Sequence, residues 1–161
     1  HISWAAVLAE EFHAPLVMHV ASPSQRVTVR VTQATHLASR AGPIRFIPTP
    51  GHTPDAMAVI WGPYLFTADT VLFNDTGRDD LPGGDAERHF ESLQILKKEA
   101  TPELIVLPGH DNKGGRAASW RSQLKSNASL AQSHQEFVPE AAAFTATAPA
   151  LLKEALRENF R

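Results

Sequence analysis

Three apolar segments of this chain each run into a tight turn that carries one side chain able to bind a metal ion. Apolar runs that end in Pro, Gly or other small residues are typical of strands followed by sharp turns. Because strand ends lie side by side in a sheet, we expect the three side chains to point into one crevice. Two imidazoles and a carboxylate suit zinc or non-haem iron. The side chains are His52, Asp69 and His110, in residues 49–55 (TPGHTPD), 67–70 (TADT) and 108–111 (PGHD).

The remaining pattern predicts a layered α/β domain. We expect strands at residues 15–20, 27–31, 44–47 and 104–107, and a hairpin formed by residues 56–61 and 64–67. Helices are predicted at residues 3–13, 85–99 and 116–125, after Ser133, and from Pro149. Strands that alternate with helices favour an α/β fold, and the hairpin makes its sheet partly antiparallel.

Composition narrows the class of protein. The 161 residues are 43% hydrophobic and 20% charged, which is typical of a single soluble domain. A net charge of -2 gives no electrostatic reason to expect nucleic acid or an anionic membrane as a partner. The chain has no cysteine, so any metal must be held by histidines and carboxylates. No apolar run is long enough to cross a bilayer, and we expect a cytoplasmic protein with a small-molecule substrate.

For each candidate residue, a functional role and a purely structural role are both open. Taken alone, each candidate ligand is more typical of a turn or surface residue, and only their combination favours a metal site. The fork of Arg78 suits either a substrate carboxylate or an ion pair with Asp79 or Asp80. Lys113 would meet the same anionic substrate or remain in solvent. We expect surface or packing positions for His13, His19, His36, His89 and His134, and core positions for Trp4, Trp61 and Phe90.

Rival chemistries lack their motifs. The sequence contains no Gly-x-Ser-x-Gly elbow, no Walker phosphate loop and no Rossmann glycine pattern. Nucleophilic catalysis through cysteine is excluded, because the chain has none. Metal-dependent chemistry is the reading that the residues favour.

The three turn motifs resemble those of the metallo-β-lactamase superfamily. The resemblance implies a four-layer αββα sandwich with one or two divalent metal ions at one edge. By this likeness His52 would bind the first ion, and Asp69 would bind the first ion or bridge two. His110 would bind a second ion or line the pocket. Ala68 stands where the family usually has glycine.

Further motifs are similar to the glyoxalase II and persulfide dioxygenase branch. They are residues 76–81 (TGRDDL), 84–86 (GDA) and 108–114 (PGHDNKG). With Fe(II), the resemblance implies a dioxygenase that oxidises glutathione persulfide to sulfite and glutathione, with an upstream histidine, His52 and Asp69 as ligands. With Zn(II), it implies a glyoxalase II-like hydrolase of glutathione thioesters. Ligand type alone does not choose between the two metals. The likeness of residues 108–114 to persulfide dioxygenases favours the dioxygenase over the hydrolase.

The beginning of the chain also resembles a family motif. His1-Ile2-Ser3 is similar to the end of the segment His-x-His-x-Asp-His, so His1 would be its last metal ligand. We therefore expect residues 1–161 to form one metallo-β-lactamase-like domain that is truncated at its N-terminus and holds mainly the C-terminal half of the fold. A truncated or degenerate module without catalytic activity is the third alternative. No pattern indicates an oligomeric state.

Overall fold

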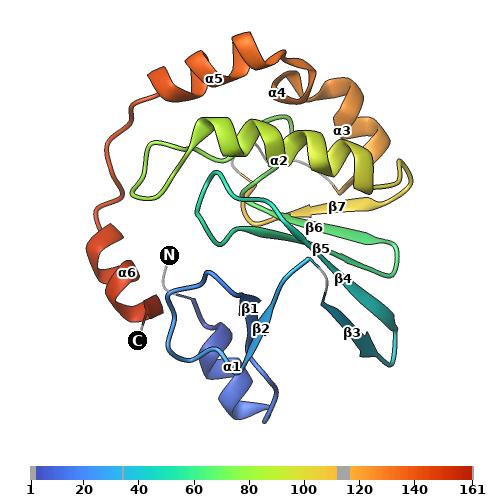
Figure 1. The fold of residues 1–161 in the computed structure, drawn as a ribbon, viewed down its shortest axis with the longest axis vertical. Helices are drawn as coiled ribbons and strands as arrows, with labels where there is room; N and C mark the ends of the chain where they lie inside the picture. Colours follow the sequence, from blue (N-terminus) through green and yellow to red (C-terminus); the bar gives the residue numbers. More distant parts are fainter. Residues whose placement is uncertain (1–2, 34, 112–116, 161) are drawn as a thin grey trace.

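A six-stranded sheet forms the centre of the computed structural model, which describes residues 3–33, 35–111 and 117–160. Neighbouring strands run antiparallel except β6 and β7, which are parallel. Figure 1 shows the sheet in the middle of the molecule. Its strands, in spatial order, are β3 (His36–Ser39), β4 (Gly42–Pro48), β5 (Met57–Trp61), β6 (Tyr64–Ala68), β7 (Ile105–Pro108) and β8 (Ala118–Ser119).

Helices and a second, smaller sheet lie on the two sides of this sheet (Figure 1). One side carries α2 (Ala86–Glu99), α3 (Trp120–Ser126), α4 (Ala128–Ala131) and α5 (His134–Ala143). The other side carries the parallel pair β1 (Val17–His19) and β2 (Val29–Val31), followed by α1 (Ala5–Glu11). The predicted αββα layering is therefore confirmed.

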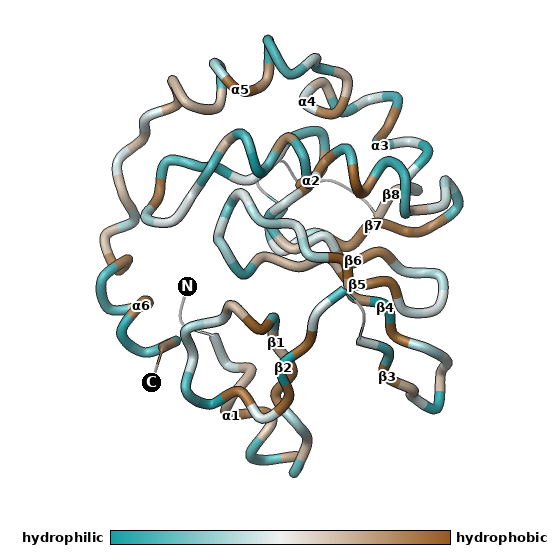
Figure 2. The backbone as a smooth tube through the Cα atoms, in the orientation of Figure 1, coloured by the Kyte–Doolittle hydropathy of each residue, from teal (hydrophilic) through white to brown (hydrophobic). Residues whose placement is uncertain are grey.

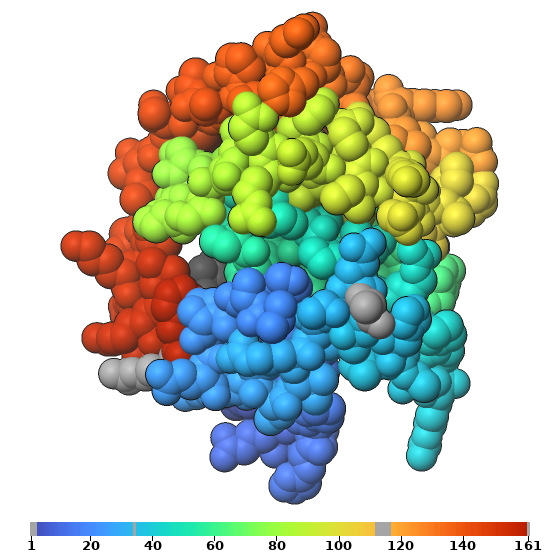
Figure 3. Space-filling model, in the orientation of Figure 1, coloured from blue at the N-terminus to red at the C-terminus, as the bar shows by residue number. Residues whose placement is uncertain are grey.

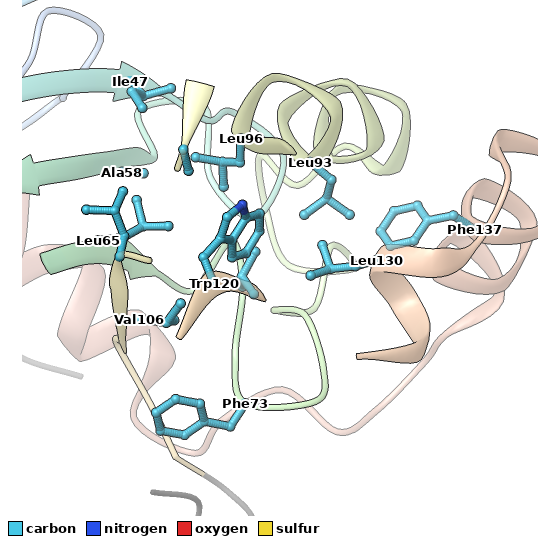
Figure 4. Close-up of a cluster of buried hydrophobic side chains, with 13 residues drawn as sticks. Ile47, Ala58, Leu65, Phe73, Leu93, Leu96, Val106, Trp120, Leu130 and Phe137 are labelled. Carbon is cyan, nitrogen blue, oxygen red and sulfur yellow. The ribbon is translucent and has the colours of Figure 1, made fainter. Parts of the chain in front are cut away.

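The hydrophobic core lies between the large sheet and the helices of α2 to α5. Figure 4 shows Trp120 at its centre, with Leu65 and Val106 from the sheet on one side and Leu93 from α2 on the other. These four side chains have no exposed surface. Burial of each stabilises the fold by about 2 kcal/mol. In Figure 2 hydrophobic and hydrophilic stretches alternate along α2, as expected for a helix with one buried side.

Most predicted elements are confirmed. The hairpin of β5 and β6 forms as expected, and α2 begins after Asp85, whose side chain accepts a hydrogen bond from the Arg88 backbone N–H. The capping box of Ser133 and Glu136 is present at the start of α5. The helix predicted at residues 116–125 begins only at Trp120, because residues 118–119 pair with β7 as a short strand. Strand β3 was not predicted. Its first and last residues, His36 and Ser39, are polar and obscure the alternation of apolar and polar residues that indicates a strand.

Two of the three aromatic residues expected in the core are not there. Trp4 is 70% exposed, because α1 buries none of its residues. Trp61 is 38% exposed at the end of the hairpin, where its indole N–H donates to the Ser39 hydroxyl over 2.9 Å. Phe90 does pack against the core cluster.

The last helix, α6 (Leu152–Phe160), returns to the N-terminal part of the chain. The Gln25 backbone N–H donates to the Phe160 carbonyl, and the Ser3 N–H donates to the Asn159 side chain. In Figure 3 the red C-terminal atoms lie directly against the blue N-terminal ones. None of the helices in the described ranges is long and apolar enough for a bilayer span.

Candidate metal centre

The three predicted ligands meet at one edge of the large sheet. His52 follows β4, Asp69 follows β6 and His110 follows β7. His52 Nε2 lies 3.5 Å from Asp69 Oδ2, and His110 Nδ1 lies 2.7 Å from Asp69 Oδ1. Their side chains are 20–37% exposed, so the cluster is open to a small molecule. The expectation that these side chains share one crevice agrees with this geometry.

A backbone carbonyl sets the orientation of the His52 ring. His52 Nδ1 lies 2.6 Å from the Arg78 carbonyl oxygen. A carbonyl only accepts, so Nδ1 carries a proton, and in the neutral imidazole Nε2 presents a lone pair toward Asp69. Metal-binding histidines are commonly held in this way, with the second ring N–H donated to a carbonyl or carboxylate.

Two glycines allow the backbone to close around Asp69. The Gly77 N–H donates to the Asp69 carbonyl over 2.8 Å, and a Cβ on Gly77 would lie 2.1 Å from that oxygen. On the other side, the Gly109 N–H donates to the Ala68 carbonyl over 2.8 Å. A Cβ on Gly109 would lie 2.5 Å from Asp69 Oδ1. Larger residues at either position would displace the carboxylate or its backbone.

The turn before Asp69 carries local strain. Ala68 has φ of 48°, a left-handed conformation that costs about 1–2 kcal/mol for a residue with a Cβ. This explains why glycine is usual here among the proteins that the motif resembles. Buried hydrogen bonds offset the strain: Thr67 Oγ1 donates to the Val71 carbonyl over 2.7 Å, and the hydroxyls of Thr49 and Thr70 lie 2.8 Å apart.

The chemistry of the cluster fits a divalent cation between His52 and Asp69. His52 Nε2 faces a carboxylate oxygen of Asp69, and a neutral imidazole and a carboxylate are both metal ligands. Two ligands of one tetrahedral ion, each about 2.1 Å from it, lie about 3.4 Å apart, close to the observed 3.5 Å. His110 does not join them, because its Nδ1 is at hydrogen-bonding distance from Asp69 Oδ1. Within the described residues, no group of three or more such side chains is already spaced around one ion.

A cavity of about 940 Å³ opens from this cluster. Its inner end is lined by His52, Asp69 and His110. Its outer end is largely apolar and includes the exposed side chains of Phe144 and Leu151. The buried residues Leu72, Phe137 and Ala155 also line the cavity. The volume is within the range of pockets that hold small-molecule ligands.

Arg78 lies in the wall of the cavity, and Asp80 is its main partner. The guanidinium donates to both carboxylate oxygens of Asp80 over 2.5 and 2.6 Å. This hydrogen bonding raises the pKa of Arg78 and lowers the pKa of Asp80 to about 2. Arg78 also donates to the carbonyls of Ala146 and Thr147. The ion-pair alternative for Arg78 is therefore present, and its role toward a substrate carboxylate stays a prediction.

Two further predicted residues, His1 and Lys113, lie outside the described residues. His89 was expected at the surface or in packing, and it is a packing residue: it is buried beneath the turns and is hydrogen bonded to Asp79 and to Thr70. The signal was its spacing, because His89, Leu93 and Leu96 follow one another on the buried side of α2.

Known proteins are similar to this chain in sequence and in fold. The sequence model of the Metallo-beta-lactamase superfamily matches residues 22–137. The probable polyketide biosynthesis zinc-dependent hydrolase BaeB of Bacillus velezensis is 30% identical over 132 residues, which are 79% of this chain and 59% of that protein. The mitochondrial persulfide dioxygenase ETHE1 of Bos taurus is 28% identical over 92 residues, which are 56% of this chain and 36% of that protein.

The crystal structure of ETHE1 from Myxococcus xanthus superposes with a TM-score of 0.92 at 27% identity. The match covers 99% of this chain and 71% of that one. The chain thus spans less than two thirds of the length of the curated relatives just named. It belongs to the metallo-β-lactamase superfamily.

Proposed function

We propose that the protein is a metal-dependent enzyme of the persulfide dioxygenase type that acts on a glutathione-like persulfide. The observation that carries this proposal is the facing pair of His52 Nε2 and Asp69 Oδ2 at the inner end of a large cavity. The likeness to the ETHE1 structure supports it, since that match extends over 99% of the chain, including the segment after α5.

His52 and Asp69 are proposed as ligands of one ion, and His110 as a residue of a second position or of the pocket wall. A bound Fe(II) ion would supply the redox chemistry that oxygen activation requires. His1 is proposed as a further ligand. The contact of His52 Nδ1 with the Arg78 carbonyl orients the ring so that Nε2 faces Asp69, where the metal would bind.

The proposed reaction conserves atoms and charge. Glutathione persulfide, dioxygen and water give glutathione, sulfite and two protons. The terminal sulfur is oxidised, the S–S bond breaks, and dioxygen is reduced. Arg78 and Lys113 are proposed to meet the carboxylates of the substrate, which requires Arg78 to share its guanidinium with Asp80.

A thioester hydrolase is the second candidate. The observation in its favour is the apolar outer end of the cavity, which suits an acyl group better than it suits a charged peptide. The 30% identity to a zinc-dependent hydrolase over 79% of this chain points the same way. With Zn(II), the metal would supply an activated water for attack on the thioester carbonyl.

Metal analysis and two assays on the full chain distinguish these candidates. We expect bound iron, with oxygen consumption that matches sulfite formation when glutathione persulfide is added. Bound zinc, hydrolysis of S-lactoylglutathione and no oxygen uptake would reject the dioxygenase in favour of the hydrolase. A protein that binds no metal and shows neither activity would be the non-catalytic module.

A matched pair of variants checks that the chemistry belongs to this cluster. Asp69→Asn should lose the metal and the activity, whereas Glu103→Gln should keep both. Glu103 is an exposed carboxylate paired with Arg121 at the end of the sheet and does not line the cavity. Equal metal content in the two variants would contradict the assignment of Asp69.

A further inference from the structure

A buried histidine beneath the proposed metal site has hydrogen-bond partners on both ring nitrogens. His89, on α2, has no exposed surface. Its Nδ1 lies 2.7 Å from Asp79 Oδ1, and its Nε2 lies 2.8 Å from the Thr70 carbonyl oxygen. The ring also meets the edge of the Phe137 ring, with centroids 5.6 Å apart and an interplanar angle of 82°. The imidazole is thus held in one plane and one orientation.

The partners of His89 define where its protons lie. The Thr70 carbonyl only accepts, so Nε2 donates to it. The Nδ1 to Asp79 contact then holds a single proton, either as an imidazolium with a carboxylate or as an imidazole with a carboxylic acid. Asp79 is only 8% exposed, and its second oxygen has no hydrogen-bond partner among the described residues. A buried pair of this kind adds little net stability to the fold. A role in positioning the backbone therefore explains its presence better.

The two partners of His89 belong to the segments that carry the proposed ligands. Thr70 directly follows Asp69 in the turn after β6. Asp79 directly follows Arg78, whose carbonyl orients the His52 ring. The His89 ring therefore connects two backbone segments of the site. One segment carries Asp69, and the other carries the Arg78 carbonyl that orients His52.

The turn that carries His52 also rests on His89. A Cβ on Gly51 would lie 2.4 Å from the Cα and Cβ of His89, so the two backbones are in direct contact. The Asp85 N–H donates to the Gly51 carbonyl over 2.8 Å, and the Ser92 hydroxyl donates to the Pro50 carbonyl over 2.6 Å. These bonds seat the turn on the first two turns of α2, with His89 between them.

We infer that His89 and Asp79 form a positioning pair, which sets the geometry of His52 relative to Asp69 without touching substrate or metal. The inference rests on the proposed metal site and adds to it residues that control its ligand geometry. Outer residues that orient metal ligands commonly change metal affinity or activity by roughly 10- to 100-fold when they are replaced.

A double replacement separates positioning from packing. His89→Leu alone leaves the Asp79 carboxyl group and the Thr70 carbonyl unpaired in the interior, so it mixes lost stability with lost geometry. The double variant His89→Leu with Asp79→Leu replaces the pair by apolar groups, which is often neutral for folding. We expect the double variant to fold, to bind Co(II) roughly 10- to 100-fold more weakly and to show a changed Co(II) absorption spectrum.

Two matched variants complete the Co(II) series. His89→Gln keeps one amide donor for the Thr70 carbonyl and should recover part of the loss. His134→Leu is the control, because this exposed histidine also meets the edge of a phenylalanine ring, that of Phe90, but bonds to Glu87 at the surface. The control should bind Co(II) as the parent does. A double variant with the parent's affinity and spectrum would overturn the inference while leaving the metal site intact.

A measurement on the metal-free protein keeps the inference separate from the proposed function. The parent should show His52 as the Nδ1–H tautomer in a long-range proton–nitrogen NMR spectrum, because the Arg78 carbonyl accepts that proton. The double variant should show a mixture of tautomers. A single unchanged tautomer in the double variant would reject the positioning role, whatever metal the parent binds. If the parent binds no Co(II) but the tautomers do mix, the proposed function fails and the positioning role stands.

Discussion

The inner and outer walls of the cavity are built in different ways. The inner wall consists of residues 49–53, 67–70 and 108–110, where backbone meets backbone with almost no space between. Gly51 and Gly109 of this wall, and Gly77 packed against it, each lie where a Cβ would come within 2.5 Å of a neighbouring atom. The threonines at 49, 67 and 70 are fully buried, and their hydroxyls are hydrogen bonded within this wall.

The outer wall consists of residues 144–152 and is held by side chains near solvent. The Arg78 guanidinium lies 5.6 Å from the centre of the Phe144 ring and donates to the Ala146 carbonyl. The Asp80 carboxylate accepts from the Ala146 N–H over 3.3 Å. Phe144 and Leu151 are 49% and 64% exposed.

The difference separates two tasks. Metal ligands must be held within a few tenths of an ångström, and backbone packing provides that constraint. A substrate wall must accommodate a side group, and side chains that touch water can repack at small cost. We therefore expect changes in the inner wall to affect catalysis and stability strongly, and changes in the outer wall to affect substrate binding weakly.

The largest expected effect comes from Asp69→Ala at the centre of the inner wall. Loss of a ligand removes the charge stabilisation that a bound metal provides, several kcal/mol, so kcat/KM should fall on the order of 10³-fold. Folding should change little, because the Asp69 side chain is 21% exposed. Activity, metal content and thermal unfolding of the same preparation check this. An active variant with full metal content would show that the inner wall does not hold the ligand.

Gly51→Ala should have the next largest effect, on stability. The new Cβ would lie 2.4 Å from His89, and Gly51 has φ of 151°. Crowding of about 1–3 kcal/mol and backbone strain of about 1 kcal/mol together predict a loss of about 3 kcal/mol. The melting temperature should fall by about 6–12 °C.

Gly42→Ala is the matched control for this change. Gly42 also has a positive φ, 109°, but no atom within 4 Å of a new Cβ, so it isolates the backbone term. We expect a loss of about 1 kcal/mol there. If both variants melt at the same temperature, close packing against α2 is not what holds the inner wall.

The inner wall was also the part that the sequence predicts best. His52, Asp69 and His110 could be named because Pro, Gly and small residues mark sharp turns wherever they follow an apolar run. Their meeting at one sheet edge follows from the order of the strands. The tautomer of His52 could not be predicted, since it depends on the Arg78 carbonyl, a backbone atom with no sequence signature.

The positions of the outer wall and of His89 could not be predicted from the sequence, for a different reason. Residues 141–148 carry no periodic pattern, and their place over the cavity depends on long-range bonds to Arg78 and Asp80. His89 has the spacing of a core residue and a polar side chain, and the sequence left its position open between the surface and packing. Polar residues on a buried helix face are therefore worth testing as parts of a site.

Phe144→Ala tests the outer wall with a smaller expected effect. The ring is half exposed and contributes a cation–π contact, so stability should fall by only about 1 kcal/mol. KM should rise a few-fold while kcat is kept, if the ring meets only the substrate. Phe137→Ala is the comparison: this ring also lines the cavity but is 3% exposed, and its loss should cost about 3–5 kcal/mol. Equal destabilisation would show that the Phe144 ring of the outer wall is held as firmly as a buried ring.

The smallest expected effect is a pH-dependent release of the outer wall. Hydrogen bonds from Arg78 lower the pKa of Asp80 from 3.8 to about 2, so the folded state binds this proton more weakly than the unfolded chain does. The stabilisation is complete above about pH 4 and is lost as the pH falls toward 2. The pair lies near solvent, so the effect should be small.

Asp80→Asn removes this proton-binding group and serves as the reference for it. Amide hydrogen exchange at residues 144–148 should be faster in Asp80→Asn than in the parent above pH 4, and the ratio of the two rates should approach one near pH 2. In the inner wall, the exchange rates of Asp80→Asn and the parent should be equal at every pH, because the hydrogen bonds of Asp80 go to Arg78 and Ala146. A parallel change at residues 67–70 would mean that both walls open together and that their different construction has no consequence in acid.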